Sequence, residues 1–374
     1  MIGSRRKIAV GLKYFWLNFL TKNGQIRALK WLSKADKLRI TQHFNASIGS
    51  FRKVLLILPE KPYDLVLTQK SVIALKQHHP DMIVEVIAEN ANKDIIKSNP
   101  FIDGGLIYNR REFFYHHPAF RELIYSLKGR RYDACFLFNR DEHPLHFFLM
   151  ANSGAPLRVA FTGSDAAPFV NLAVRPRKET EYEGDRYESL LRTLGVKVGS
   201  ARLRWNIARS SEKDVEALLI QFGLRIDRPL IGIDVSPSVY DKGFPPELLK
   251  GLIDTLVAED RAEIILFYSR EQDREQMKSF SFLNRAIVPI PEDKISFATA
   301  FINKCSLIIA LNNLVYQLGI MLGRPTVGLF ENAESRQWIC VAPGKFESVC
   351  APRLKNLSLE EILSRVKSLM PLQA

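Results

Sequence analysis

Short apolar runs alternate with segments whose apolar residues recur every three or four positions, from about residue 53 to the C-terminus. Continuous apolar runs are typical of strands buried in a parallel sheet, and the longer spacing is typical of helices packed on its faces. The first run, Val54 to Leu58, ends at Pro59, and a helical pattern and a second apolar run follow. This order predicts βαβ units of a doubly wound α/β sheet.

The alternation forms two halves. In the first half we predict strands 53–58, 83–87, 105–108, 134–138 and 158–161, the last being the final strand, and helices 65–77, 120–128 and 186–194. In the second half we predict strands 230–235, 262–268, 286–290, 307–311 and 326–330, and helices 246–258, 271–280, 295–304, 315–322 and 357–370. Two Rossmann-like halves predict an active site in the cleft between them, at the carboxyl ends of strands.

Length and composition agree with a two-domain globular protein. The 374 residues exceed a typical single core, and 47% apolar with 25% charged residues is ordinary for a folded chain. We predict a basic helical arm over 1–50, an N-terminal Rossmann-like domain over 51–215, a C-terminal Rossmann-like domain over 225–356, and a closing helix over 357–374.

The net charge of +13 is concentrated at the N-terminus. Residues 1–53 carry twelve Lys or Arg and one acid, Asp36, so this segment accounts for +11 and the remainder for only +2. Proteins that bind nucleic acid more often spread basic residues over a folded binding face, so this distribution disfavours a nucleic-acid partner.

The arm has the pattern of amphipathic helices. Apolar residues recur at helical spacing from Ile8 to Phe19, but Lys13 and Asn18 interrupt them, which argues against a membrane-spanning helix and against a secretory signal. Basic helices with Trp and Phe are typical of interfacial anchors on anionic membranes. The alternative is that the helices pack on the protein's own core and leave the basic face solvated. The candidates for membrane contact are Lys13, Trp16, Arg27, Lys30, Trp31, Lys34 and Lys37.

Other common site signatures are missing from the sequence. The four cysteines are scattered without a Cys-x-x-Cys pair, which favours reduced thiols in a cytosolic protein, and the adjacent histidine pairs are poorly spaced for chelation, so we predict no metal site. Neither Gly-x-Gly-x-x-Gly, Walker A, Gly-x-Ser-x-Gly nor His-Glu-x-x-His occurs.

Several segments resemble one family in order and spacing. Segment 53–81 is similar to its opening strand, Gly-Asp loop, helix and "yPd" turn, and 153–161 to its "sGap-R-iGf" segment. Segment 187–196 resembles the helix that ends in "LGv", 234–245 the "hPG(S/T)…K.WP" loop, and 312–325 the "D-T-G-x-x-H" helix. Over about residues 50–372 the chain thus resembles glycosyltransferase family 9, the ADP-heptose:lipopolysaccharide heptosyltransferases.

The resemblance implies a GT-B fold, with two Rossmann-like domains facing across a cleft. In such a fold the domain over 51–215 is the acceptor domain and the domain over 225–356 is the nucleotide-sugar domain. It implies an inverting, metal-independent glycosyltransferase that moves a sugar, heptose from ADP-heptose, to the lipopolysaccharide core or a related membrane-anchored glycan. The nucleotide sugar is then a substrate and no cofactor is needed. The implied location is cytoplasmic and peripheral on the inner membrane, with the acceptor linked to lipid.

The resemblance also implies roles for particular residues. Asp64 matches the base that deprotonates the acceptor hydroxyl; its alternative interpretation is a helix N-cap. Lys242 matches a cation that stabilises the departing diphosphate, and Ser236 and Ser238 of the same loop are candidate hydrogen-bond donors to it.

The sugar-nucleotide motif departs from the family pattern. Asn312, Asn313, Leu314 and Gln317 stand where the family has Asp, Thr, Gly and His. The three polar residues can still hydrogen-bond to a donor, but they supply neither the charge of Asp nor the titration of His. Leu314 places a side chain at a helix N-terminus that phosphate would approach.

Two acidic residues are further candidates for contact with the donor. Glu271 and Asp273 lie near the family's acidic donor contact; alternatively they are acids favourable at a solvated helix N-terminus. The alternative function is a catalytically silent GT-B relative that binds glycan or protein, which the altered motif favours.

Overall fold

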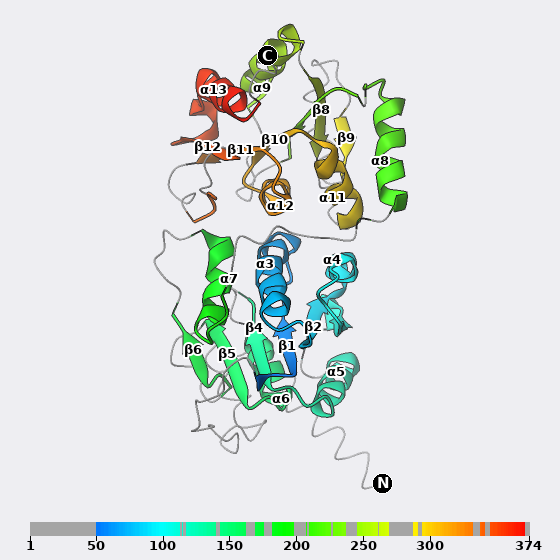
Figure 1. Cartoon of the computed structure of the whole chain (residues 1–374), viewed down its shortest axis with the longest axis vertical. Helices are drawn as coiled ribbons and strands as arrows, with labels where there is room; N and C mark the ends of the chain where they lie inside the picture. Colours follow the sequence, from blue (N-terminus) through cyan, green and yellow to red (C-terminus); the bar gives the residue numbers. More distant parts are fainter. Residues whose placement is uncertain are drawn as a thin grey trace. The chain divides into compact units, whose positions relative to one another are not determined.

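The computed structural model describes residues 50–112, 114, 117–139, 143–161, 169–175, 182–197, 207, 209–225, 227–236, 245–260, 262–268, 287–290, 294–331, 337–340 and 345–370. These residues form two compact α/β units, each shown in Figure 1 with helices against a sheet. Segment Asp94–Pro100 and residues 182–185 belong with the C-terminal unit. The predicted basic arm lies outside the described residues.

The N-terminal unit contains a six-stranded parallel sheet in the order β3-β2-β1-β4-β5-β6. Its strands are β1 (Lys53–Ile57), β2 (Ile83–Glu89), β3 (Gly104–Tyr108), β4 (Ala134–Leu137), β5 (Leu157–Phe161) and β6 (Leu172–Val174). Its helical segments are α3 (Pro62–His78), α5 (Pro118–Lys128), α6 (Pro144–Asn152) and α7 (Glu183–Arg192), and α4 (Lys93–Ser98) follows β2. Figure 1 shows α3 and α7 on one face of this sheet, and a buried cluster joins α5 and α6 to the other.

Three elements of this unit were not predicted from the sequence: α4, β6 and α6. Strand 158–161 is not the last, because β6 follows it; only Val174 of β6 is buried, so this edge strand lacks the apolar run by which strands were found. Helix α6 was not predicted, since apolar residues surround almost its whole circumference and leave no helical period.

The C-terminal unit repeats the same topology. Its sheet has the order β12-β11-β10-β7-β8-β9, all parallel, which is the first sheet's order read from the other edge. The strands are β7 (Leu230–Asp234), β8 (Glu263–Tyr268), β9 (Ile287–Pro289), β10 (Leu307–Leu311), β11 (Thr326–Glu331) and β12 (Phe346–Ala351). The helices are α8 (Arg209–Gln221), α9 (Pro246–Ala258), α11 (Ile295–Lys304), α12 (Leu314–Leu322) and α13 (Leu359–Leu369). The predicted helix 271–280 lies outside the described residues.

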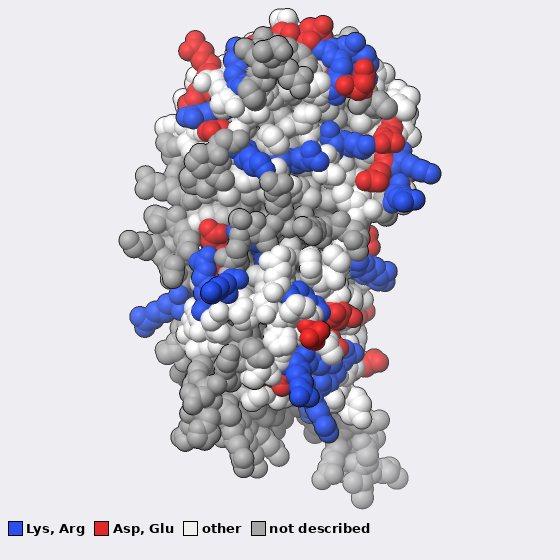
Figure 2. All heavy atoms as spheres, in the orientation of Figure 1, with Lys and Arg blue, Asp and Glu red and all other residues white. Residues whose placement is uncertain are grey.

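Charged side chains on the described surface are mixed in sign. Figure 2 shows Lys and Arg interspersed with Asp and Glu over the described part of one face. Several form ion pairs, such as Lys250 with Asp254 and Lys304 with Glu216. Pairs this exposed contribute little to stability.

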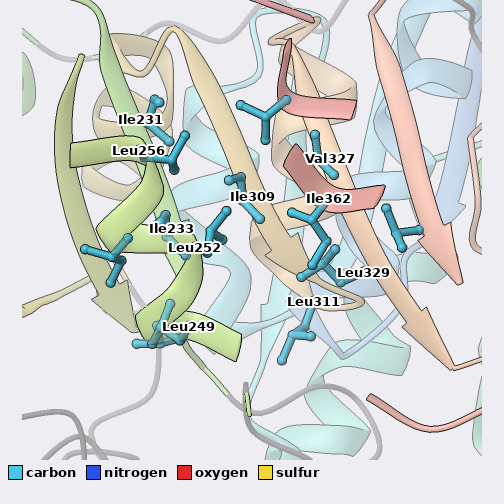
Figure 3. Close-up of a cluster of buried hydrophobic side chains, with 14 of the residues drawn as sticks. Ile231, Ile233, Leu249, Leu252, Leu256, Ile309, Leu311, Val327, Leu329 and Ile362 are labelled. Atoms are coloured by element: carbon cyan, nitrogen blue, oxygen red, sulfur yellow. The ribbon is translucent and has the colours of Figure 1, made fainter. Parts of the chain in front are cut away.

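One face of the second sheet is covered by α9 and α13. Figure 3 shows Leu249, Leu252 and Leu256 of α9 and Ile362 of α13 over the central strands. The strand residues beneath them are Ile231, Ile233, Ile309, Leu311, Val327 and Leu329. All are buried, and full burial of such a side chain is worth about 1.5–3 kcal/mol.

The opposite face holds α12 very close to the sheet. A Cβ on Gly328 would lie 2.5 Å from the Tyr316 ring, and one on Gly319 would lie 2.6 Å from Thr326 Oγ1. Two glycines therefore permit this approach, which fixes where α12 begins relative to the ends of β7 and β10.

Candidate active site

Each sheet has one point at which the strand order reverses: between β1 and β4 in the N-terminal unit, and between β7 and β10 in the C-terminal unit. In doubly wound sheets, ligands bind outside the carboxyl ends of the strands at this point. The residues that follow these four strands are therefore the first place to look for a site in either unit.

In the C-terminal unit a buried carboxylate occupies this position. Asp234 ends β7 and has no exposed surface. Its Oδ1 accepts hydrogen bonds from the Ser236 backbone N–H at 3.0 Å and the Ser236 hydroxyl at 2.5 Å. The Asn313 side-chain amide donates to Oδ2. The hydrogen bonds from Ser236 and Asn313 offset the desolvation of the carboxylate and bridge β7 to α12.

Asn313 is also the N-cap of α12. Its Oδ1 accepts from the backbone N–H groups of Val315 at 3.0 Å and Tyr316 at 3.4 Å. Amides at a helix N-terminus are the groups that bind phosphate in many nucleotide sites. Here two of them are already bonded to a side chain, and the Leu314 side chain is buried beside them.

The two other predicted donor contacts on this segment are buried as well. Asn312 is 3% exposed and Gln317 is fully buried. Gln317 Oε1 accepts a hydrogen bond of 2.6 Å from the Tyr182 hydroxyl, so the position where the family has His holds an amide bonded to a phenol. The structure thus brings Ser236, Asn312, Asn313 and Gln317 to the ends of two adjacent strands.

In the N-terminal unit Asp64 lies in the first turn of α3, directly after β1. The N-cap is Lys61, so the alternative interpretation of Asp64 as the cap is wrong. Pro62, whose fixed φ suits the first helical position, begins the helix earlier than the apolar pattern predicts. Asp64 is partly exposed, and a carboxylate in a first turn is favoured by the helix dipole.

A second polar cluster, centred on Glu60 and not predicted from the sequence, lies at the same edge of the sheet. The Tyr108 hydroxyl donates to Glu60 Oε1 at 3.0 Å, and Arg110 Nε lies 3.4 Å from Oε2. His146 Nε2 lies 3.9 Å from Oε1. These residues come from different strand ends and from α6, so no local spacing links them; the one available signal is that Glu60 and Tyr108 each stand at the end of a strand.

His146 is held neutral by its surroundings. Burial lowers its pKa to about 3, and the neighbouring His143 acts in the same direction. The Asn139 side-chain nitrogen lies 3.2 Å from His146 Nδ1. His143 caps α6 by accepting the Leu145 backbone N–H at 3.2 Å, so both histidines have structural partners within the N-terminal unit.

The remaining predicted site residues cannot be placed. Ser238, Lys242, Glu271 and Asp273 lie outside the described residues, as do the arm residues Lys13, Trp16, Arg27, Lys30, Trp31, Lys34 and Lys37. Within the described ranges no helix has the length and apolar character needed to cross a membrane. No cluster of three or more His, Cys, Asp or Glu suited to a metal ion occurs in that same part of the chain.

Comparison with known proteins gives a consistent result. No protein-family model matches the chain. Lipopolysaccharide heptosyltransferase 2 of Escherichia coli is 23% identical over 298 residues, which are 74% of this chain and 82% of that protein.

Solved structures are similar over most of the chain. A glycosyltransferase family 9 protein from Veillonella parvula gives a TM-score of 0.73 at 16% identity, covering 87% of this chain and 98% of that one. The E. coli ADP-heptose lps heptosyltransferase II gives 0.68 at 18% identity, covering 85% and 98%. The E. coli heptosyltransferase WaaC with ADP gives 0.66 at 15% identity, covering 85% and 99%.

The two parallel sheets and these similarities define the fold as that of the GT-B glycosyltransferases. Within this class, the chain is similar to glycosyltransferase family 9 and its fold is like that of the lipopolysaccharide heptosyltransferases, which confirms the resemblance noted in the sequence.

Proposed function

We propose that this chain is an inverting, metal-independent glycosyltransferase. It transfers a sugar, heptose from ADP-heptose, to the lipopolysaccharide core or a related membrane-anchored glycan. The observation that carries the proposal is the position of Asp64, a carboxylate in the first helical turn after β1, within a heptosyltransferase-like fold. The choice of donor is supported by the complex of the WaaC heptosyltransferase with ADP-2-deoxy-2-fluoro heptose.

The proposed chemistry assigns a proton acceptor and a stabilised leaving group. Asp64 takes the proton from the acceptor hydroxyl while that oxygen attacks the anomeric carbon of the donor. The bond from that carbon to the diphosphate breaks, and the electron pair leaves with the diphosphate. Lys242, with Ser238, stabilises the developing charge, and Glu271, Asp273, Asn312 and Gln317 contact the remainder of the donor. Ser236, whose N–H and O–H both donate to Asp234, positions the start of the loop of Lys242 and Ser238.

The N-terminal arm is assigned to the membrane in this proposal. Its basic residues would contact the anionic inner leaflet, each contributing on the order of 1 kcal/mol near the surface. Such a contact holds the enzyme at the cytoplasmic face, where a lipid-linked acceptor is concentrated.

A second candidate is a catalytically silent relative that binds glycan or protein. The observation that favours it is the hydrogen-bond network of Asp234, Ser236 and Asn313, which occupies two backbone amides of α12 from within the chain. A site closed in this way has lower affinity for an anionic donor than one with open amides.

Turnover separates the two candidates. Purified protein is incubated with ADP-heptose and a heptose-deficient lipopolysaccharide, and ADP release and product mass are measured. We expect release by the wild type and a loss of at least about 100-fold in Asp64→Asn, the lower end of the range for removing a general base, with donor affinity retained. Equal and negligible release by both proteins, with both folded, would favour the silent relative.

A further inference from the structure

Glu60 lies at the topological switch point of the N-terminal sheet. It follows β1, and its contacts come from both sides of that strand: Tyr108 ends β3, and His146 lies in the helix after β4. Sheets of this order bind ligands outside the carboxyl ends of the strands at this point. Asp64 lies one turn further along the chain, so the cluster adjoins the proposed catalytic residue without including it.

Hydrogen bonds within the protein hold the backbone at Glu60 in place without a ligand. Asn92, fully buried after β2, donates from Nδ2 to the carbonyl oxygen of Glu60 at 2.7 Å and to that of Pro59 at 3.3 Å. A polar group held by its neighbours binds a ligand without the cost of ordering it at that moment.

The Glu60 carboxylate and the His146 imidazole are a hydrogen-bond acceptor and a donor that lie close together, an arrangement suited to binding a hydroxyl group. With Asn139 donating to His146 Nδ1, the neutral imidazole carries its proton on Nε2, which faces Glu60 Oε1 across 3.9 Å. That separation exceeds a direct hydrogen bond. The carboxylate accepts, the imidazole N–H donates, and a hydroxyl group can do both at once.

The side chains around Glu60 range from buried to exposed. The His146 side chain is 1% exposed, that of Glu60 is 20% exposed, and that of Arg110 is 72% exposed. The carboxylate therefore lies at the boundary of a buried polar layer with solvent. Burial, reinforced by Glu60, raises the pKa of Tyr108, so this residue remains a hydroxyl donor at neutral pH.

From this geometry we propose that Glu60 is the centre of a binding subsite for an uncharged sugar. Its carboxylate accepts hydrogen bonds from sugar hydroxyls, the Tyr108 hydroxyl orients it, and its charge disfavours a sugar acid. The inference deepens the proposed function, since the sugar would belong to the acceptor saccharide, but binding here requires no donor and no turnover.

The test is saturation-transfer NMR on the full chain, with methyl α-mannopyranoside and methyl α-glucopyranoside as uncharged probes and glucuronate as the charged one. Glu60→Gln keeps the shape and removes the charge, and Tyr108→Phe removes one hydroxyl. Glu112→Gln is the matched control, because Glu112 is another Glu that follows a strand of this sheet, β3, but it accepts a hydrogen bond from Asn109 instead.

We expect a methyl glycoside to bind the wild type in the millimolar range, Glu60→Gln to weaken it about tenfold, and Tyr108→Phe to weaken it severalfold. Glu112→Gln should stay within about twofold, since surface substitutions away from a site have small effects. Unchanged binding in both Glu60→Gln and Tyr108→Phe, binding of glucuronate alone, or no binding of either glycoside to the wild type would overturn the proposal. None of these outcomes depends on donor binding, so the proposed function is judged separately.

Discussion

Asn313 does for α12 what a bound phosphate does at the start of many nucleotide-binding helices. Its side-chain oxygen satisfies two backbone amides, and its nitrogen bonds to the buried Asp234. Asn is among the best N-cap residues, so the substitution that alters the family pattern is structurally favourable. The sequence predicted that this segment is altered, but the bond to Asp234 joins residues far apart in the chain and could not be predicted from either segment alone.

Replacing Asn313 by Gly should tighten ADP binding. The change frees the Val315 and Tyr316 amides, and the cap itself costs the helix only a few tenths of a kcal/mol, because Gly is a tolerated N-cap. The change also removes the hydrogen bond to the buried Asp234, which lowers the stability of the unit by about 1–3 kcal/mol, so folding of the variant is checked first. We expect the dissociation constant for ADP, measured by calorimetry, to fall about tenfold, the value of one hydrogen bond to a charged group.

The matched control for Asn313→Gly is Ser358→Gly, which removes the N-cap of α13 in the same unit. It should leave ADP affinity unchanged. Weaker ADP binding by Asn313→Gly would contradict this account and would support Asn313 as a donor contact, as the sequence predicted.

At the scale of elements, the Glu85 carboxylate of β2 bonds both to β1 and to the segment that precedes β4. Glu85 of β2 forms an ion pair with Lys53 of β1 at 2.9 Å and accepts from Arg130 at 2.8 Å and from Tyr132 at 2.6 Å. Burial alone would raise the pKa of Glu85, but these three hydrogen bonds outweigh it and lower the pKa to about 2. The carboxylate is therefore more readily ionised in the folded chain than in the unfolded one.

Glu85→Gln should destabilise the N-terminal unit by about 2 kcal/mol at pH 7, as expected for hydrogen bonds to a charged group. Because the folded pKa is depressed, the stabilisation is fully present above the unfolded pKa of about 4.5 and is lost as the pH falls toward 2. Urea unfolding of both proteins at pH 7 and pH 3 measures this. A difference that does not shrink at pH 3 would show that Glu85 acts through shape and not through charge.

Helices and strands were predicted correctly where the spacing of apolar residues was regular. Helices 246–258 and 295–304 and strand 307–311 have the observed bounds. Strand β12 was missed because four of its six residues are partly or fully exposed, so no apolar run marks it. Tertiary contact, which the local pattern does not contain, decides such edge strands.

At the scale of the whole molecule, the resemblance in the sequence predicted the two-sheet fold, and the solved structures support it. The sequence placed Asp64, Ser236 and the 312–317 segment at strand ends, as observed. It could not predict the Glu60 cluster, because three separate elements must assemble to form it.

The most direct test of the account is calorimetric titration of the full chain with ADP, ADP-heptose, UDP and UDP-hexoses, with Lys242→Ala beside it. We predict that the wild type binds one nucleotide sugar with a Kd in the micromolar range. Lys242→Ala should weaken that binding at least about tenfold, since a charged contact to the diphosphate is lost. No binding of any nucleotide or nucleotide sugar by a folded wild-type protein would contradict the account and leave the silent relative as the better description.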